Sequence, residues 1–208
     1  AHWLKEKHLH HGSKLIEVGS NDGTLLENFK NTNIEAVGFE PSITIAELAN
    51  KKGIKTLSKF FNTQNLDEIK NFHSSVDVIC SANVIAHIPD LKDVIKCVDK
   101  LLSSKGLLIF EEPYLGSMFS KISYDQIYDE HIFMFSVNSI KKIFDLFDFE
   151  LIDVLPQVTH GGSMRYVIGR KNKHKKSEIV SKFLDEEQSK KLDTIESCLD
   201  FKKACELS

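Results

Sequence analysis

Two patterns of apolar residues alternate along the chain after residue 13. Nearly unbroken runs of strand-forming residues predict strands at about 14–19, 34–40, 54–57, 76–82 and 107–111. Apolar residues at helical spacing predict helices at about 22–29, 42–52, 66–72 and 91–102. Parallel strands need crossover connections, which are usually helices, so this alternation is typical of a parallel sheet with helices on both faces.

The alternation stops at Pro113. Residues 113–135 form an insertion rich in aromatic and acidic side chains. A helix is expected at about 137–147, followed by two adjacent strands at about 149–155 and 164–168 that we expect to be antiparallel. We therefore predict an α/β fold with a doubly wound, mostly parallel sheet in residues 1–170. Residues 171–208 are predicted to be a solvated basic linker followed by one continuous helical pattern over 176–208.

Composition narrows the class of protein. The 208 residues are 41% hydrophobic and 27% charged, enough for one α/β domain with a sizeable core. The net charge of −3 offers no basic excess for nucleic acid, and no apolar run approaches the length of a membrane span. The four cysteines lack C-x-x-C spacing, so we expect reduced thiols in a cytoplasmic protein without a metal site. The oligomeric state cannot be read from the sequence.

A glycine motif follows the first predicted strand. Its pattern, Glu17-x-Gly19-x-x-x-Gly23, is neither the G-x-G-x-x-G of dinucleotide sites nor a phosphate-binding loop. An acidic residue at the end of the strand suits a cationic ligand, and S-adenosylmethionine carries both an ammonium and a sulfonium. An ordinary tight strand-to-helix turn is the alternative. The candidate cofactor contacts in this motif are Glu17, Gly19, Ser20, Asn21, Asp22 and Gly23.

Further candidates end the next strands, where open parallel sheets bind their ligands. Glu40 could accept hydrogen bonds from both ribose hydroxyls, or could be a carboxylate at the N-terminus of the next helix. Phe60 or Phe61 could pack on an adenine or belong to the core. The remaining candidates of this group are Pro41 and Asn83 for the cofactor and His87 for the substrate. For His87 a structural role is the alternative, because a lone histidine is usually structural.

Two polar clusters carry residues suited to chemistry. In Tyr128-Asp129-Glu130-His131, His131 suits a general base, Tyr128 a donor or second proton carrier, and Glu130 an orienting partner. A surface loop of mixed polar residues is the alternative. In the second cluster, the two glycines of His160-Gly161-Gly162 would let the backbone approach a ligand. Arg165 could pair with a phosphate or simply belong to the final strand.

The blocks IEVGSNDGTLL, GFEPS, ANVIAHIPDL, FEEPYL, IYDEH and THGGSMR occur in this order between Lys14 and Arg170. Together they resemble the S-adenosylmethionine-dependent sugar C-methyltransferases that act on nucleotide-linked keto-deoxysugars. The resemblance implies a Rossmann-like, seven-stranded class I methyltransferase fold. It also implies methylation of a carbon next to the ketone of the sugar, with S-adenosylhomocysteine as the product and a nucleotide-linked sugar as the substrate.

The same resemblance implies roles for individual residues. Tyr128, Glu130 and His131 would surround the reacting carbon, with His131 as the base, whereas the glycine loop and Glu40 would contact the cofactor. The candidates for the sugar side are His87, Tyr114, His160, Gly161, Gly162 and Arg165. Nothing is carried over to Asp129, because family members often have histidine at that position.

The chain departs from the family pattern at both ends. Family members usually begin with a zinc-binding domain with cysteine pairs, and they usually continue into a C-terminal lobe; neither is expected in this sequence. Two other functions remain open: an O- or N-methyltransferase acting on another small metabolite, and a non-catalytic domain that binds the cofactor. The glycine spacing disfavours a nicotinamide-dependent oxidoreductase.

Overall fold

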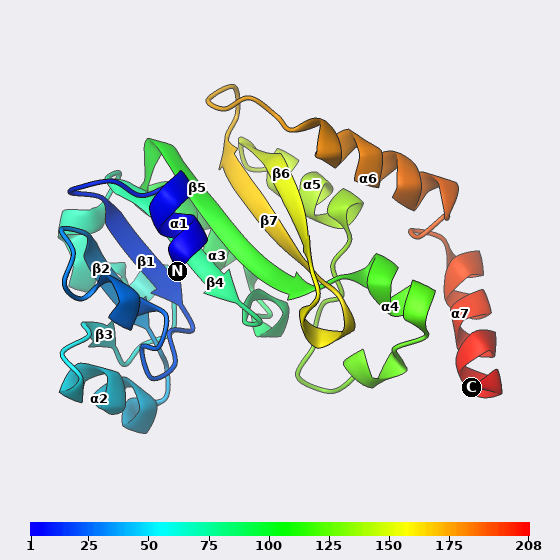
Figure 1. Ribbon diagram of the computed structural model, residues 1–208, viewed down its shortest axis with the longest axis horizontal. Coiled ribbons are helices and arrows are strands. Elements are labelled where there is room, and N and C mark those ends of the chain that lie inside the picture. Colours follow the sequence, from blue (N-terminus) through cyan, green and yellow to red (C-terminus); the bar gives the residue numbers. More distant parts are fainter. The chain divides into compact units, whose positions relative to one another are not determined.

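The computed structural model describes residues 1–208 and divides into two compact units. Unit 1 comprises Ala1–Val84 and Asp90–Ile109, and unit 2 comprises Ile85–Pro89 and Phe110–Ser208. Seven strands are hydrogen-bonded in the order β3-β2-β1-β4-β5-β7-β6, and β5 contributes residues to both units (Figure 1). The prediction of a doubly wound, mostly parallel α/β sheet is confirmed.

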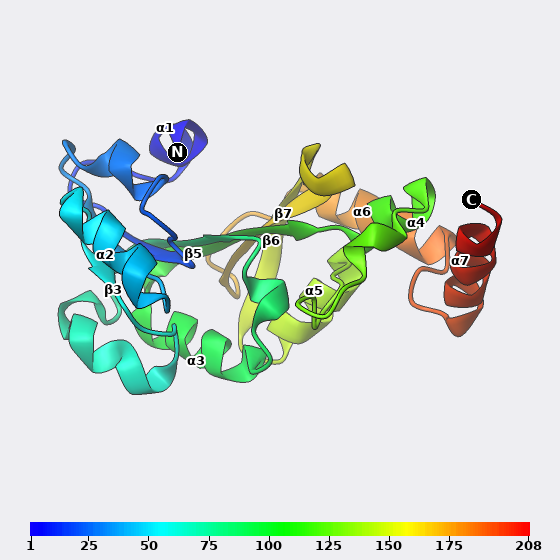
Figure 2. The same cartoon turned by 90° about the horizontal axis from the view of Figure 1, so that it is seen from below.

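Unit 1 contains the parallel part of the sheet. Strand β1 pairs in parallel with β2 and with β4, and β2 pairs in parallel with β3. Helices α1 and α3 lie on opposite sides of these strands (Figure 2). Its elements are α1 (His2–Lys7), β1 (Lys14–Val18), η1 (Leu26–Phe29), β2 (Glu35–Phe39), α2 (Ile43–Lys51), β3 (Thr56–Leu57), η2 (Thr63–Phe72), β4 (Val76–Ala82), α3 (Leu91–Leu101) and most of β5 (Leu102–Pro113).

The predicted apolar runs form strands of the sheet, and the central strands are buried on both faces. Leu15, Ile16, Val78 and Ile79 have no exposed surface, as expected for the central strands of a parallel sheet. Strand β5 begins at Leu102, earlier than the predicted residue 107. Helix α3 is one-sided, with Val94, Ile95, Cys97, Val98 and Leu101 buried. The sequence therefore positions the carboxyl ends of β1, β2 and β4, where the candidate cofactor residues follow.

The helix predicted over 22–29 is wrong for its first half. Only Leu26–Phe29 is helical, and it is a short 3₁₀ segment. Asn21 and Gly23 have positive φ angles of 50° and 81°, which a right-handed helix does not allow. The Asp22 carboxylate accepts hydrogen bonds from the amide and the hydroxyl of Thr24. These local bonds satisfy the polar groups of a turn in place of the first helical turn.

Unit 2 contains an antiparallel pair of strands and the C-terminal helices. Strands β6 and β7 are antiparallel, with a register shift between Leu151 and Asp153, and both α5 and α6 pack on β6. Phe110 lies in the core, with its ring centroid 5.1 Å from that of Tyr166 and 6.2 Å from that of Phe144. Its elements are η3 (Ile85–His87), the end of β5, α4 (Leu115–Lys121), η4 (Tyr124–Gln126), α5 (Val137–Asp145), β6 (Phe149–Gln157), η5 (Thr159–Gly161), β7 (Ser163–Arg170), α6 (Glu178–Ser189) and α7 (Ile195–Leu207).

The prediction of one continuous helix over 176–208 is wrong. Helix α6 ends at Ser189, and α7 begins at Ile195. Lys191 has a positive φ of 51°, and Leu192 is buried at 5% exposure. Thr194 caps α7 by accepting a hydrogen bond from the Ser197 amide. Burial of Leu192 and the new cap therefore favour a turn over helical continuation. No helix of this chain has both the length and the apolar composition needed to cross a bilayer.

Candidate active site

The loop after β1 is held against the end of β2. The amides of Gly19 and Ser20 both donate to the carbonyl of Phe39, at 2.8 and 3.0 Å. Gly19 has a φ of +70°, and a Cβ atom there would lie 2.3 Å from the Val84 side chain. Only glycine fits this combination of backbone angle and close approach. The loop is thus fixed by protein contacts at the point where the sequence places a cofactor.

Glu40 lies at the end of β2, and both of its carboxylate oxygens are oriented by backbone amides. The Asn21 amide donates to Oε2 at 3.1 Å, and the Ser42 amide donates to Oε1 at 2.9 Å. Ser42 is the N-cap of α2, so Glu40 does act at a helix N-terminus, as one sequence interpretation proposed. Each oxygen keeps a second lone pair, so the same orientation also suits a ligand with two adjacent hydroxyls.

Glu17 and Ser20 present buried polar atoms that lack hydrogen-bond partners. Glu17 is 8% exposed and Ser20 is 2% exposed. Neither Glu17 Oε2 nor Ser20 Oγ has a hydrogen-bond partner. Burial raises the pKa of Glu17 to about 8. A buried acceptor without a donor is costly, and a bound ammonium group would satisfy it. These residues therefore fit the cationic ligand inferred from the sequence.

Replacing Glu17 with glutamine should remove a pH dependence of stability. Because the folded-state pKa is raised, the folded chain keeps this proton between pH 4.5 and about 8, whereas the unfolded chain loses it. The contribution of Glu17 to the free energy of unfolding of the wild type is therefore fully present below pH 4.5. It decreases as the pH rises toward about 8. The free energy of unfolding of Glu17→Gln minus that of wild type should therefore increase by about 4 kcal/mol from pH 5 to pH 9.

Urea unfolding at several pH values measures this difference. Glu47→Gln is the matched control, because Glu47 is an exposed carboxylate on α2 of the same unit. Its stability difference from wild type should stay constant with pH. A Glu17→Gln difference that is equally constant from pH 5 to pH 9 would show that Glu17 titrates normally.

The other cofactor candidates differ in what they contact. Asp22 bonds Lys52 at 2.7 Å as well as Thr24, and the bond to Lys52 is the main cause of a pKa lowered to about 2. Phe61 is buried against Phe39, with ring centroids 5.2 Å apart, so it belongs to the core. Phe60 is 68% exposed, Asn83 follows β4 with a φ of 56°, and Pro41 is exposed. Phe60, rather than Phe61, is therefore available to a ligand.

A hydrogen-bonded pair of side chains forms the centre of the candidate site in unit 2. The Tyr128 hydroxyl lies 3.1 Å from His131 Nε2, and His131 Nδ1 lies 2.8 Å from the carbonyl oxygen of Gln126. A carbonyl only accepts hydrogen bonds, so Nδ1 carries the proton of the neutral ring. Nε2 is then the basic atom, and it faces the phenol of Tyr128.

Backbone contacts bring His87 to the same place. The amides of Ile132 and Phe133 donate to the Ala86 carbonyl at 3.0 and 3.2 Å. This ties the segment after His131 to η3, and the ring centroids of His87 and His131 lie 4.9 Å apart. The structure therefore groups Tyr128, His131 and His87.

The residue that orients His131 was missed by the sequence reasoning. Glu130 was expected in that role, but its side chain is exposed and no hydrogen bond joins it to His131. The orienting group is the Gln126 carbonyl. Every residue type carries such a carbonyl, so no sequence signal could have identified it.

Most of the candidates for the sugar side contact other parts of unit 2. Tyr114 is buried and its hydroxyl donates to Glu187 at 2.9 Å; burial and this carboxylate raise its pKa. Arg165 pairs with Glu111 at 3.0 Å, which offsets its charge. Their binding of substrate remains a prediction.

The two glycines of the second polar cluster, Gly161 and Gly162, contact α4. Gly162 has a φ of 130°, and a Cβ atom there would lie 2.5 Å from Ser117 Oγ. Lys121 donates to the carbonyl of Gly161. His160 is exposed, with a φ of 49°. The space that a glycine leaves open at Gly162 is therefore filled by Ser117 of the same chain rather than left for a ligand.

Comparisons with known proteins agree with this description. Residues 4–154 match the family described as "Methyltransferase domain", and residues 158–207 match "C-methyltransferase C-terminal domain". The chain is 31% identical over 179 residues to C-methyltransferase NovU of Streptomyces niveus. That match covers 86% of this chain but only 43% of NovU, so the chain spans less than half the length of this relative.

Solved structures show the same fold at low identity. One is a SAM-dependent methyltransferase of Thermotoga maritima, a possible histamine N-methyltransferase, with a TM-score of 0.62 and 20% identity; it covers 82% of this chain and 86% of that chain. Another is a Haloferax volcanii complex between the Trm112 methyltransferase activator and a methyltransferase, with a TM-score of 0.64 and 14% identity; the match covers 81% and 87%. The chain therefore belongs to the methyltransferase domain family and has the class I methyltransferase fold, and its residues 158–207 match the C-methyltransferase C-terminal domain.

Proposed function

We propose that this chain transfers a methyl group from S-adenosylmethionine to a carbon next to the ketone of a nucleotide-linked keto-deoxysugar. The observation that carries the proposal is the arrangement of Tyr128, His131 and the Gln126 carbonyl, which makes Nε2 a base beside a phenolic donor. Methylation of a carbon needs this combination, because a proton must leave before the carbon becomes nucleophilic. The likeness to C-methyltransferase NovU supports the choice of a carbon acceptor.

In this proposal the polar groups of unit 1 bind the cofactor. S-adenosylmethionine supplies a methyl group on a positively charged sulfur, which needs no metal for its transfer. Glu17 Oε2 and Ser20 Oγ accept hydrogen bonds from its ammonium, which would give both buried atoms the partner they lack. Glu40 accepts from the two ribose hydroxyls, and Phe60 packs on the adenine.

The residues of unit 2 move the proton. When the sugar binds, the Tyr128 hydroxyl turns from His131 to the keto oxygen and frees the lone pair of Nε2. Nε2 takes the proton from the carbon, and the imidazolium keeps its hydrogen bond to the Gln126 carbonyl. The electron pair of the broken C–H bond forms an enolate, whose oxygen accepts a hydrogen bond from Tyr128. The enolate carbon would then form the new bond to the methyl group while the methyl carbon–sulfur bond breaks, its electron pair returns to the sulfur and S-adenosylhomocysteine leaves. All of the groups used lie within residues 1–170, which we propose as the methyltransferase domain.

The bond that the methyl group forms distinguishes this function from its alternatives. The chain is incubated with ¹³C-methyl-labelled S-adenosylmethionine and a panel of nucleoside-diphosphate keto-deoxysugars. We expect a ¹³C-methyl signal coupled to a ring carbon and resistant to acid cleavage. A label on oxygen or nitrogen would support the O- or N-methyltransferase instead. Binding of S-adenosylhomocysteine without turnover on any member of the panel would favour the non-catalytic domain.

A further inference from the structure

Glu187 of α6 is a buried carboxylate with no role in the chemistry proposed above. It is 3% exposed and accepts three hydrogen bonds. The Tyr114 hydroxyl and the Val137 amide donate to Oε1, at 2.9 and 2.6 Å, and the Asn138 amide donates to Oε2 at 2.8 Å. A buried charge of this kind is stable only when such donors replace its hydration.

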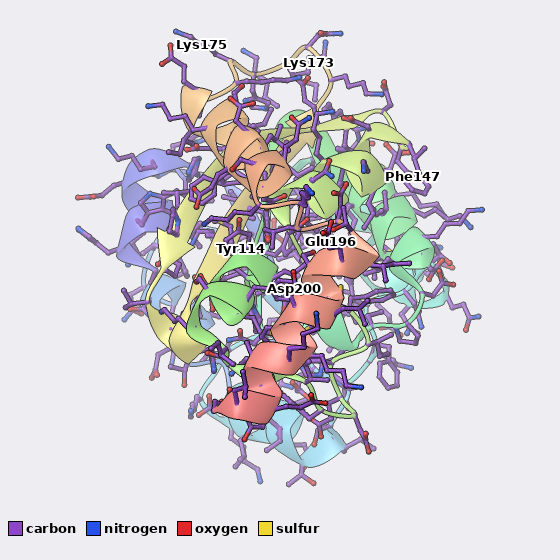
Figure 3. All side chains as sticks on the ribbon, turned by 90° about the vertical axis from the view of Figure 1, so that its right-hand side faces the viewer. Tyr114, Phe147, Lys173, Lys175, Glu196 and Asp200 are labelled. Carbon is purple, nitrogen blue, oxygen red and sulfur yellow. The ribbon has the colours of Figure 1, made fainter.

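The three donors lie at the two ends of the insertion that carries Tyr128 and His131. Tyr114, the second residue of the insertion, stands immediately before α4 (Figure 3), and Val137 opens α5 just after the insertion has ended. The two ends also meet directly, because the Leu115 amide donates to the Phe135 carbonyl at 2.9 Å. One carboxylate thus ties both ends of residues 115–135 to α6.

Capping of α5 alone does not explain this arrangement. Helix α5 already has a capping box between Ser136 and Ser139. Glu187 adds bonds to the first two amides of the helix, where the helix dipole favours a negative charge. Tyr114 has no part in that cap, yet its hydroxyl shares the same oxygen, and its ring contacts Phe183 of α6 edge-on at 6.0 Å.

We propose that Glu187 is a positioning residue, which holds the insertion in the conformation that places Tyr128 and His131 for catalysis. This inference rests on the proposed function and adds a link from α6, within the C-methyltransferase C-terminal segment, to the reacting groups. Positioning errors of about 1 Å can lower rates about 100-fold, so loss of this anchor should reduce kcat more than it affects cofactor binding.

Three substitutions test the anchor in steps. Tyr114→Phe removes one donor. Glu187→Gln keeps an acceptor for Tyr114 and Val137 but sets an amide NH₂ against the Asn138 amide. Glu187→Leu removes every acceptor. We expect kcat to fall roughly threefold for Tyr114→Phe, tenfold for Glu187→Gln and 100-fold for Glu187→Leu, with the Kd for S-adenosylhomocysteine within twofold of wild type. Glu186→Gln, an exposed neighbour that pairs with Lys190, is the matched control and should be unchanged.

Hydrogen exchange gives a readout that does not depend on turnover. Peptides covering residues 115–135 should exchange faster in Glu187→Leu, whereas peptides of β1, β2 and β4 should keep wild-type rates. Wild-type kcat in folded Glu187→Leu would overturn the proposal, and so would faster exchange throughout the chain. If Glu187→Leu does not fold, Glu187→Gln and Tyr114→Phe decide: unchanged kcat and exchange in both would overturn it. If wild type itself has no turnover, the proposed function fails, and selective exchange at 115–135 still tests the anchor.

Discussion

Replacing His131 with alanine is expected to lower kcat for methylation by at least about 100-fold while leaving the affinity for S-adenosylhomocysteine unchanged. The variant loses the only group for which the structure fixes a basic nitrogen beside Tyr128. Its cofactor affinity should persist, because the Gly19 loop and Glu40 belong to unit 1. Initial rates with labelled cofactor give kcat, and calorimetry with S-adenosylhomocysteine gives the Kd.

The proton-transfer step can be followed without methyl transfer. In D₂O, with S-adenosylhomocysteine bound, wild type should exchange the proton next to the ketone of the sugar, and NMR records its loss. His131→Ala should not exchange it above the rate without enzyme. Tyr128→Phe should exchange it slowly, because Nε2 remains but the enolate oxygen loses its donor.

The matched control is His73→Ala. His73 is an exposed histidine of unit 1 and belongs to neither candidate site. This variant should keep the wild-type rate of methylation. Full activity in His131→Ala would rule out His131 as the base, and a parallel loss of cofactor binding would mean that the substitution acts on the fold.

Replacing Glu40 with alanine should raise the Kd for S-adenosylhomocysteine about 10- to 100-fold. Hydrogen bonds to a charged acceptor are worth about 1.5–3 kcal/mol, which corresponds to this range. The variant loses the acceptors proposed for the ribose and also the bond that holds the Asn21 amide. Calorimetric titration of the folded variant measures the change.

Two comparisons separate ribose binding from a structural role of Glu40. Glu47→Ala removes an exposed carboxylate from α2 of the same unit and should leave the Kd unchanged. Wild type should also bind 2′-deoxyadenosine analogues of the cofactor more weakly, whereas Glu40→Ala should bind both forms equally. An unchanged Kd in Glu40→Ala would remove Glu40 from the cofactor site.

Much of the fold could be predicted because burial leaves a direct record in the sequence. The run Val76–Ala82 is nearly all apolar, and it became the buried strand β4. The glycine motif could be placed at the end of β1 because glycine adopts a positive φ without steric cost, as Gly19 does at 70°. Periodicity failed where local bonds competed with the helix, as at Asp22 and Thr194.

The sequence by itself determined which candidate functional motifs the chain carries and where they follow the strands. These motifs are a glycine loop after β1, an acidic residue after β2 and a Tyr-x-Glu-His block in the insertion. Those features depend on residue types, which a sequence states directly. Only the tertiary structure decided that the Gln126 carbonyl contacts His131 Nδ1, that Arg165 pairs with Glu111, and that Glu187 accepts hydrogen bonds from both Tyr114 and the start of α5. These contacts join backbone atoms or residues distant in the chain, and neither composition nor spacing encodes which partners meet after folding.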